Sequence, residues 1–271
     1  MAKHVQWSTS MHLKNGHPKC YAQALGKCSS QLSREHYVSD KVLRAISLAQ
    51  SAVRVSGLRF QPSGMDQELG IGSLTGNILC QKHNSDLSDF DNAGSQFFSA
   101  MERLMVTGNS ALTLRIKGDQ IEAWMLKTMV GGVFCGAFSV PEGTIPKNTL
   151  PPQGFLETLF EDVPLIEPLG LYLWHGEKGE RLLTDYKVLR IELLFGSAFD
   201  HSEKVTLCGV RMWIFGIEFY LSILPLPDPL PGRWQHTVYR PTEIIGPNRA
   251  SLIIEWKGIG GNRPVRFGNM N

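Results

Sequence analysis

The sequence predicts an α+β protein built from two consecutive parts. Apolar residues recur at helical spacing in residues 39–50 and 85–108, whereas the second half of the chain consists mainly of strand-like runs. The first third is also dense in Cys, His, Asn and Ser. Since 271 residues exceed a typical single domain, we expect a first module at residues 18–108 and a mostly β, α+β domain at residues 109–271.

The composition is that of an ordinary globular protein, with 42% hydrophobic and 19% charged residues. The net charge of +2 neither indicates nor excludes nucleic-acid binding. The longest apolar run, which starts at Met212, is interrupted by Glu218 and by prolines, so it predicts buried strands and no membrane span. The first residues lack the apolar segment of a signal peptide, and we therefore expect a cytoplasmic protein without a membrane partner.

The first module is predicted to contain short elements. Residues 39–50 form a helix capped by Ser39 or Asp40, and residues 52–64 form a strand and a turn. Residues 85–108 form one or two further helices, which begin at Ser85 and end at Gly108.

The C-terminal part begins with an alternating strand at residues 110–118. Residues 119–139 have helical periodicity, and we expect Gly131 and Gly132 to loosen this helix. Residues 140–165 contain five prolines and are interpreted as a loop or linker. Strand-like runs make up the remainder.

The cysteines fall into two groups. Five cysteines, an odd number, in a chain expected to be cytosolic argue against a disulfide framework. Cys135 and Cys208 lie in apolar surroundings and are predicted to be small buried hydrophobic residues. Cys20, Cys28 and Cys80 lie in the first third, where polar residues are dense.

Three cysteines and one histidine are spaced as zinc ligands. Cys80 and His83 form a compact C-x2-H knuckle, and Cys20 and Cys28 form a wider C-x7-C pair. Structural zinc takes four such ligands, commonly from two knuckles, so we expect these four residues to bind Zn²⁺. The alternative is that the three cysteines are unrelated, since the second spacing is wider than the usual two to four residues.

An acid-histidine pair, Glu35 and His36, lies where a short strand is expected to end, just before the first predicted helix. Asn84 directly follows the C-x2-H knuckle. Carboxylate and amide oxygens suit a hard divalent ion such as Mg²⁺. A histidine beside such a site can take a proton from water, which is the chemistry of phosphodiester hydrolysis. If one zinc joins the two segments, Glu35, His36 and Asn84 lie near each other.

The stretches "CYAQALGKCSSQLSREHYVSDKVL" and "LCQKHNSDLS" together resemble the HNH endonuclease family, whose core is the ββα-metal fold. The resemblance covers roughly residues 18 to 95. It implies that Glu35 is the metal-binding acid, His36 the general base and Asn84 the second metal ligand. It also implies structural zinc ligands at Cys20, Cys28, Cys80 and His83.

The sequence departs from the family pattern at three points. His83 stands where the family usually has a fourth zinc-binding cysteine. The middle Asn of the motif falls at Thr75, with Asn77 two positions late, and the segment between His36 and Asn84 is long enough to require an insertion in the hairpin. In a rival register His83 is the catalytic metal ligand, which leaves the zinc site one ligand short.

The function predicted from the sequence is a metal-dependent endonuclease that cuts double-stranded DNA, with host defence as the setting suggested by the family. Basic residues near the motif, which suit a phosphate-binding rim, are Arg34, Lys41, Arg44 and Lys82. The C-terminal domain would choose the target, sense a signal or form a homodimer. The alternative is a non-catalytic, zinc-stabilised protein that binds nucleic acid or another protein.

Overall fold

The computed structural model has a mixed α+β fold, in which helices and three sheets alternate along the chain. The residues that the structure describes are 16–47, 52–62, 65–106, 111–141, 145–174, 188–197, 205–224, 237–257 and 264–267. Within these ranges no helix has the combined length and hydropathy needed to cross a bilayer.

Strands β1 (Leu32–His36) and β4 (Thr75–Cys80) form an antiparallel pair in which Leu32 lies opposite Cys80 and His36 opposite Thr75. The strand that carries the acid-histidine pair therefore ends where the sequence predicts. The segment between these strands is the predicted insertion. It contains α1 (Asp40–Ile46), β2 (Ala52–Ser56), β3 (Gln67–Gly70) and the 3-10 turn η2 (Ile71–Ser73), while η1 (Gln23–Leu25) precedes the hairpin.

Two helices follow β4 without a linker. Helix α2 (Gln81–Asp86) begins directly after Cys80, and α3 (Ser88–Val106) begins after a break at Leu87. The predicted start at Ser85 is therefore wrong, because the turn that carries the C-x2-H knuckle is already helical. The predicted end at Gly108 lies outside the described residues.

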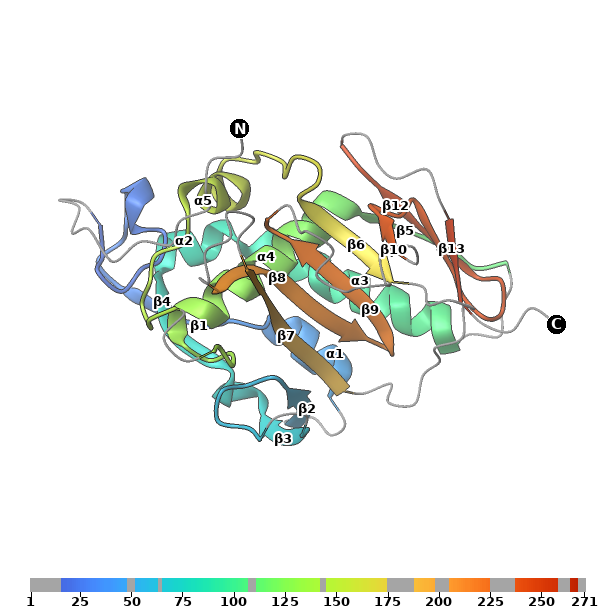
Figure 1. Ribbon diagram of the computed structural model, residues 1–271, viewed down its shortest axis with the longest axis horizontal. Helices are drawn as coiled ribbons and strands as arrows, with labels where there is room; N and C mark the ends of the chain where they lie inside the picture. The colour runs from blue at the N-terminus through green and yellow to red at the C-terminus, as the bar shows by residue number, and fades with distance from the viewer. Residues whose placement is uncertain are drawn as a thin grey trace.

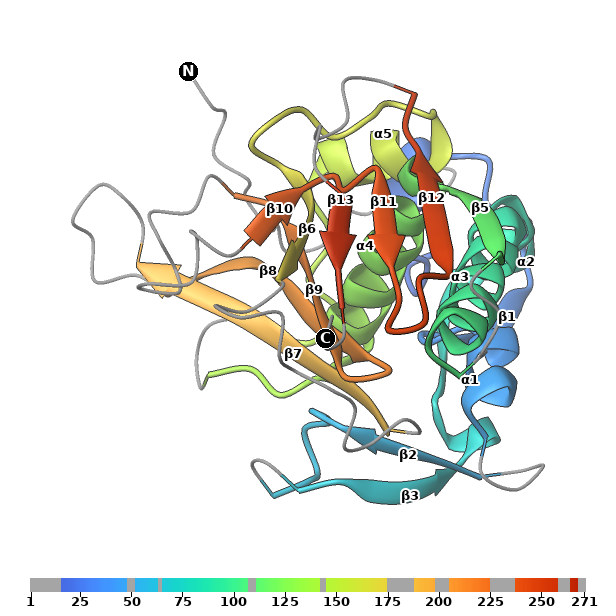
Figure 2. The same cartoon turned by 90° about the vertical axis from the view of Figure 1, so that its right-hand side faces the viewer.

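The largest sheet has seven strands in the order β10-β6-β9-β8-β7-β2-β3. Strand β2 pairs in parallel with β7, and Figure 2 shows β2 and β3 below β7 at that edge. Strands from both predicted parts thus share one sheet. The boundary predicted between residues 108 and 109 falls outside the described residues. The remaining strands of this sheet are β6 (Gly170–Trp174), β7 (Val188–Ser197), β8 (Val205–Ile214), β9 (Ile217–Ser222) and β10 (Thr237–Tyr239).

A smaller sheet has the order β13-β11-β12-β5. The predicted strand at residues 110–118 is β5 (Thr113–Lys117), which pairs in parallel with β12. The other members are β11 (Glu243–Ile245), β12 (Ser251–Glu255) and β13 (Pro264–Arg266).

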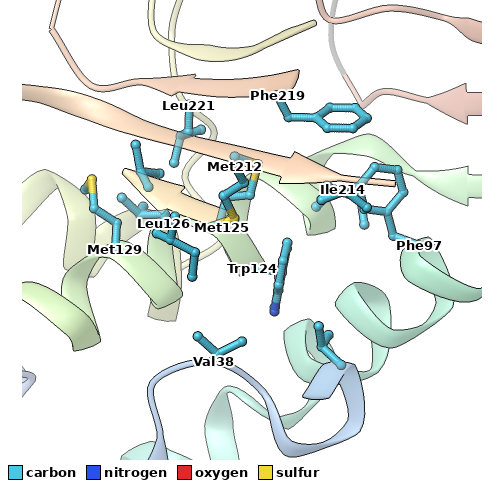
Figure 3. Packing of buried hydrophobic residues seen from close by; sticks show 14 of the residues in the cluster. Val38, Phe97, Trp124, Met125, Leu126, Met129, Met212, Ile214, Phe219 and Leu221 are labelled. Atoms are coloured by element: carbon cyan, nitrogen blue, oxygen red, sulfur yellow. The ribbon is translucent and has the colours of Figure 1, made fainter. Parts of the chain in front are cut away.

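Helix α4 (Gly118–Cys135) is the centre of the molecule, since 15 of its 18 residues are buried (Figure 1). A helix that is apolar on all sides is expected to be buried on all sides. Figure 3 shows its side chains beneath the strands that carry Met212, Ile214, Phe219 and Leu221. Gly131 and Gly132 let neighbours approach, because a Cβ would lie 3.2 Å from Tyr37 at the first position and 2.0 Å from Phe138 at the second.

The predicted loop at residues 140–165 is wrong in its second half, which contains α5 (Gln153–Phe160). Pro152 occupies the position before the first helical residue, where proline is tolerated because no internal hydrogen bond is lost. Phe155, Leu156 and Leu159 bury the inner face of this helix. The prolines therefore delimit a helix.

Replacing Gly94 by alanine tests the close packing of α3 on α4. A Cβ at this position would lie 2.6 Å from Trp124 Nε1, and such overpacking typically costs about 1–3 kcal/mol. We expect Gly94→Ala to lower the free energy of unfolding by that amount in urea titrations. Gly154→Ala is the control, because a Cβ there meets nothing within 4 Å and alanine favours the helix by up to about 1 kcal/mol. Equal free energies of unfolding in the two variants would contradict the close contact between Gly94 and Trp124.

Candidate metal centre and the adjoining acid site

The predicted zinc ligands come from four separate places in the chain. Cys20 lies before η1, Cys28 lies in the loop between η1 and β1, Cys80 ends β4, and His83 lies in the first turn of α2. The spacing of Cys80 and His83 places both side chains on one side of the turn. The backbone N–H of Tyr21 donates to the Ile78 carbonyl, and this hydrogen bond connects the segment that carries Cys20 to the β1–β4 hairpin.

The four side chains converge as a metal site requires. Their ligand atoms all lie within 4.8 Å of one another. His83 Nδ1 is 3.4 Å from Cys20 Sγ, 3.7 Å from Cys28 Sγ and 3.3 Å from Cys80 Sγ. A tetrahedral zinc with ordinary Zn–S and Zn–N bonds has S···N edges of about 3.5–3.6 Å. The donor set and its spacing therefore fit a metal such as zinc.

The centre is shielded from solvent. Cys20, Cys80 and His83 are buried, and the Phe160 ring of α5 packs edge-on against the His83 ring at 5.3 Å. Burial raises the pKa of the Cys20 thiol and lowers that of His83. Burial also raises the pKa of the Cys80 thiol, but hydrogen bonds from backbone N–H groups, led by that of His83, outweigh this effect. The pKa of Cys80 is therefore lowered overall. A thiolate there is the form that binds zinc.

Glu35 is buried at the end of β1 and faces helix α4. Its Oε1 lies 2.6 Å from Lys127 Nζ, although this contact lacks the geometry of a hydrogen bond. Burial raises the pKa of Glu35, while the Lys127 ammonium and a hydrogen bond from the Asn84 side chain act in the opposite direction. Glu35 and Asn84 are thus brought together, as the sequence predicts.

Asn84 joins α2 to the hairpin. Its Nδ2 donates to Ser33 Oγ over 2.8 Å, and Ser33 and Glu35 both belong to β1. The pairing of β1 with β4 is irregular between Ser33 and Glu35, and the Asn84 side chain also lowers the pKa of Glu35 through a hydrogen bond. The amide thereby reaches both the strand and its acid.

His36 is half-buried, and its Nε2 lies 3.7 Å from Asp40 Oδ1 at the start of α1. Burial lowers the pKa of His36, Asp40 opposes this shift, and Lys127 and Arg34 add to it. The neutral imidazole is therefore favoured. Among the described residues, His36 Nε2 has no hydrogen-bond partner.

The two candidates for the middle motif residue differ in their surroundings. Thr75 lies opposite His36 in the hairpin, and its hydroxyl accepts a hydrogen bond from Arg34 Nε and donates to the Gly72 carbonyl. Asn77 is exposed. Thr75 is thus the one that braces the end of the hairpin.

All four basic residues of the predicted rim are exposed. Each already has a polar partner: Arg34 contacts Thr75, Lys41 contacts Asn92, Arg44 contacts Asp40, and Lys82 contacts Asp86.

Two residues of the ion-pair cluster around Glu35, namely Lys127 and Asp91, were not predicted from the sequence. Lys127 is 2% exposed and comes from α4, and its Nζ also lies 2.5 Å from Asp91 Oδ1 of α3. Lysine is almost never fully buried unless it is paired. The signal available in the sequence was one lysine within the otherwise apolar run "AWMLKTMV".

Comparison with protein-family models, curated proteins and solved structures found no match to this chain.

Removing one cysteine of the cluster tests the metal centre. We expect the purified protein to contain one zinc per chain and Cys80→Ser to lose most of it, with a fall in Tm of roughly 10 °C, because ligand binding is coupled to folding. Metal content by mass spectrometry and thermal unfolding measure both effects. Cys135→Ser is the control, since Cys135 lies outside the cluster. Equal zinc content in the two variants would rule out this centre.

Proposed function

We propose that this protein is a metal-dependent endonuclease that hydrolyses phosphodiester bonds, with double-stranded DNA as the expected substrate. The observation that carries the proposal is the meeting of the Glu35 carboxylate and the Asn84 side chain, between the end of β1 and the start of α2, beside the Cys/His cluster. This arrangement matches the strand, strand and helix order expected of the HNH family.

The residues divide the chemistry as follows. Glu35 and Asn84 supply oxygen atoms that would hold a hard divalent ion such as Mg²⁺. When bound, such an ion stabilises the charge that develops on the phosphate. His36 takes a proton from the attacking water at Nε2, and its lowered pKa keeps that nitrogen free to accept it. The cluster of Cys20, Cys28, Cys80 and His83 holds the hairpin to the helix.

Substrate binding is assigned to the exposed basic residues of β1, α1 and α2. Arg44 and Lys82 have surface ion pairs, which are worth little, and Arg34 and Lys41 bond to neutral side chains. A phosphate can therefore replace the present partners. Contacts of this kind position the backbone without reading sequence. Choice of target, sensing of a signal or formation of a homodimer is left to the strand-rich C-terminal part.

A second candidate function is a zinc-stabilised binding protein without catalysis. The contact between Glu35 and Lys127 favours it, because an acid that already has a cationic partner is not free to bind a metal. The two candidates differ in one respect: only the nuclease needs His36 for its activity.

Cleavage of supercoiled plasmid DNA by the zinc-loaded protein tests the proposal. We expect nicking with Mg²⁺ or Mn²⁺, none with a chelator in excess of the divalent ion, and a loss of about 10²–10⁴-fold in His36→Ala, the usual contribution of a general base. DNA binding in a gel-shift assay should remain, because His36 is not part of the basic rim.

Glu102→Gln is the matched control for Glu35→Gln, since Glu102 is an exposed residue of α3. Glu35→Gln should abolish cleavage, and Glu102→Gln should leave it unchanged. Unaltered cleavage in a folded, zinc-bound His36→Ala variant would refute the assigned base. DNA binding without cleavage under any divalent ion would favour the second candidate.

A further inference from the structure

The two carboxylates of Glu35 and Asp91 share one buried cation. Lys127 Nζ lies 2.6 Å from Glu35 Oε1 and 2.5 Å from Asp91 Oδ1, and the side chains of Lys127 and Glu35 are 3% and 7% exposed. One ammonium between two carboxylates leaves the group a net negative charge when all three are ionised. Such a group attracts further positive charge, and the low exposure makes that attraction strong.

Asp91 is oriented by contacts other than the lysine. Ser39 donates its hydroxyl hydrogen to Asp91 Oδ1 and accepts a hydrogen bond of 2.9 Å from Trp124 Nε1. Ser39 precedes α1, Asp91 lies on α3 and Trp124 lies on α4. The carboxylate is therefore held by Ser39 as well as by the ammonium, and Trp124 in turn fixes the Ser39 hydroxyl.

Two buried oxygen atoms near the hairpin, the Tyr21 hydroxyl and Glu35 Oε1, lack a hydrogen-bond partner among the described residues. Tyr21 is 1% exposed, and within the described part of the chain its hydroxyl has no hydrogen-bond partner. Buried oxygen atoms without hydrogen bonds cost free energy, and a cation that contacts Glu35 Oε1 would satisfy that atom.

We propose that Glu35 and Asp91 form a divalent-cation site in which Lys127 is the resident counter-ion, so that a metal ion binds by displacing the ammonium. The inference rests on the proposed function for the identity of the cation, and it adds Asp91 as a ligand that the motif does not contain. The ammonium and the metal ion need the same two carboxylate oxygen atoms, and their positive charges would repel each other if both were bound there. The lysine thus sets the metal concentration at which the site fills.

The test is Mn²⁺ binding to the zinc-loaded full chain, followed by electron paramagnetic resonance of the free ion. We expect Lys127→Met to bind Mn²⁺ at least about tenfold more tightly than the unmodified protein. The substitution removes a positive charge that lies next to both carboxylates and competes with Mn²⁺ for them. The double variant Lys127→Met/Asp91→Asn should lose this gain. Lys117→Met is the control, since Lys117 is exposed on β5, and it should leave the affinity unchanged.

Equal Mn²⁺ affinity in the folded Lys127→Met variant and the unmodified protein would overturn the inference and leave Lys127 as a structural tie. Tight binding that survives in the double variant would remove Asp91 from the site. If Lys127→Met does not fold alone, refolding with and without Mn²⁺ decides: recovery only with Mn²⁺ supports the site, and no recovery overturns it. Since no arm measures cleavage, a protein that binds Mn²⁺ in this way but cuts no DNA refutes only the nuclease.

Discussion

The rest of the structure depends on the burial of helix α4. A helix enclosed on all sides leaves no route to water for its polar side chains, so each buried charge needs a partner from another element. Glu122 receives two hydrogen bonds from Arg240, at 2.8 and 2.9 Å, and a third from the Leu171 backbone N–H. Lys127 forms ion pairs with Glu35 and Asp91. One helix thereby contacts the large sheet through Glu122, near its N-terminus, and the hairpin through Lys127, near its middle.

The Cys/His cluster is the second connection between distant segments. It links elements that are too short to be stable alone. Helix α2 has six residues and β1 has five, and isolated helices of that length are marginal in water. Ligands before η1, after η1, at the end of β4 and within α2 fasten these pieces at one point. Helix α5 covers that point through Phe160. The position of Glu35 relative to Asn84 is therefore set by the Cys/His cluster and by α4 together.

Much of the candidate site could be predicted from local patterns. A C-x2-H knuckle, a nearby pair of cysteines and an acid-histidine pair identify ligand types, and ligand chemistry depends on residue type and spacing. The four predicted ligands do converge. Helix α5 was missed because prolines were interpreted as breaks, whereas Pro152 precedes the first helical residue. Strand β2 was expected, but its parallel pairing with β7 links segments more than a hundred positions apart.

By itself, the sequence determined the mixed α+β class, the four residues of the Cys/His cluster and the C-terminal end of the strand that carries Glu35 and His36. These follow from residue types and short periodicities, which act over a few positions of the chain. The tertiary structure alone decided that Lys127 meets both Glu35 and Asp91, that Tyr21 is buried and that β2 and β3 join the large sheet. Such pairings depend on which surfaces the packing of α4 brings together. No local pattern encodes the partner of a buried charge, because that partner is chosen by burial and distance.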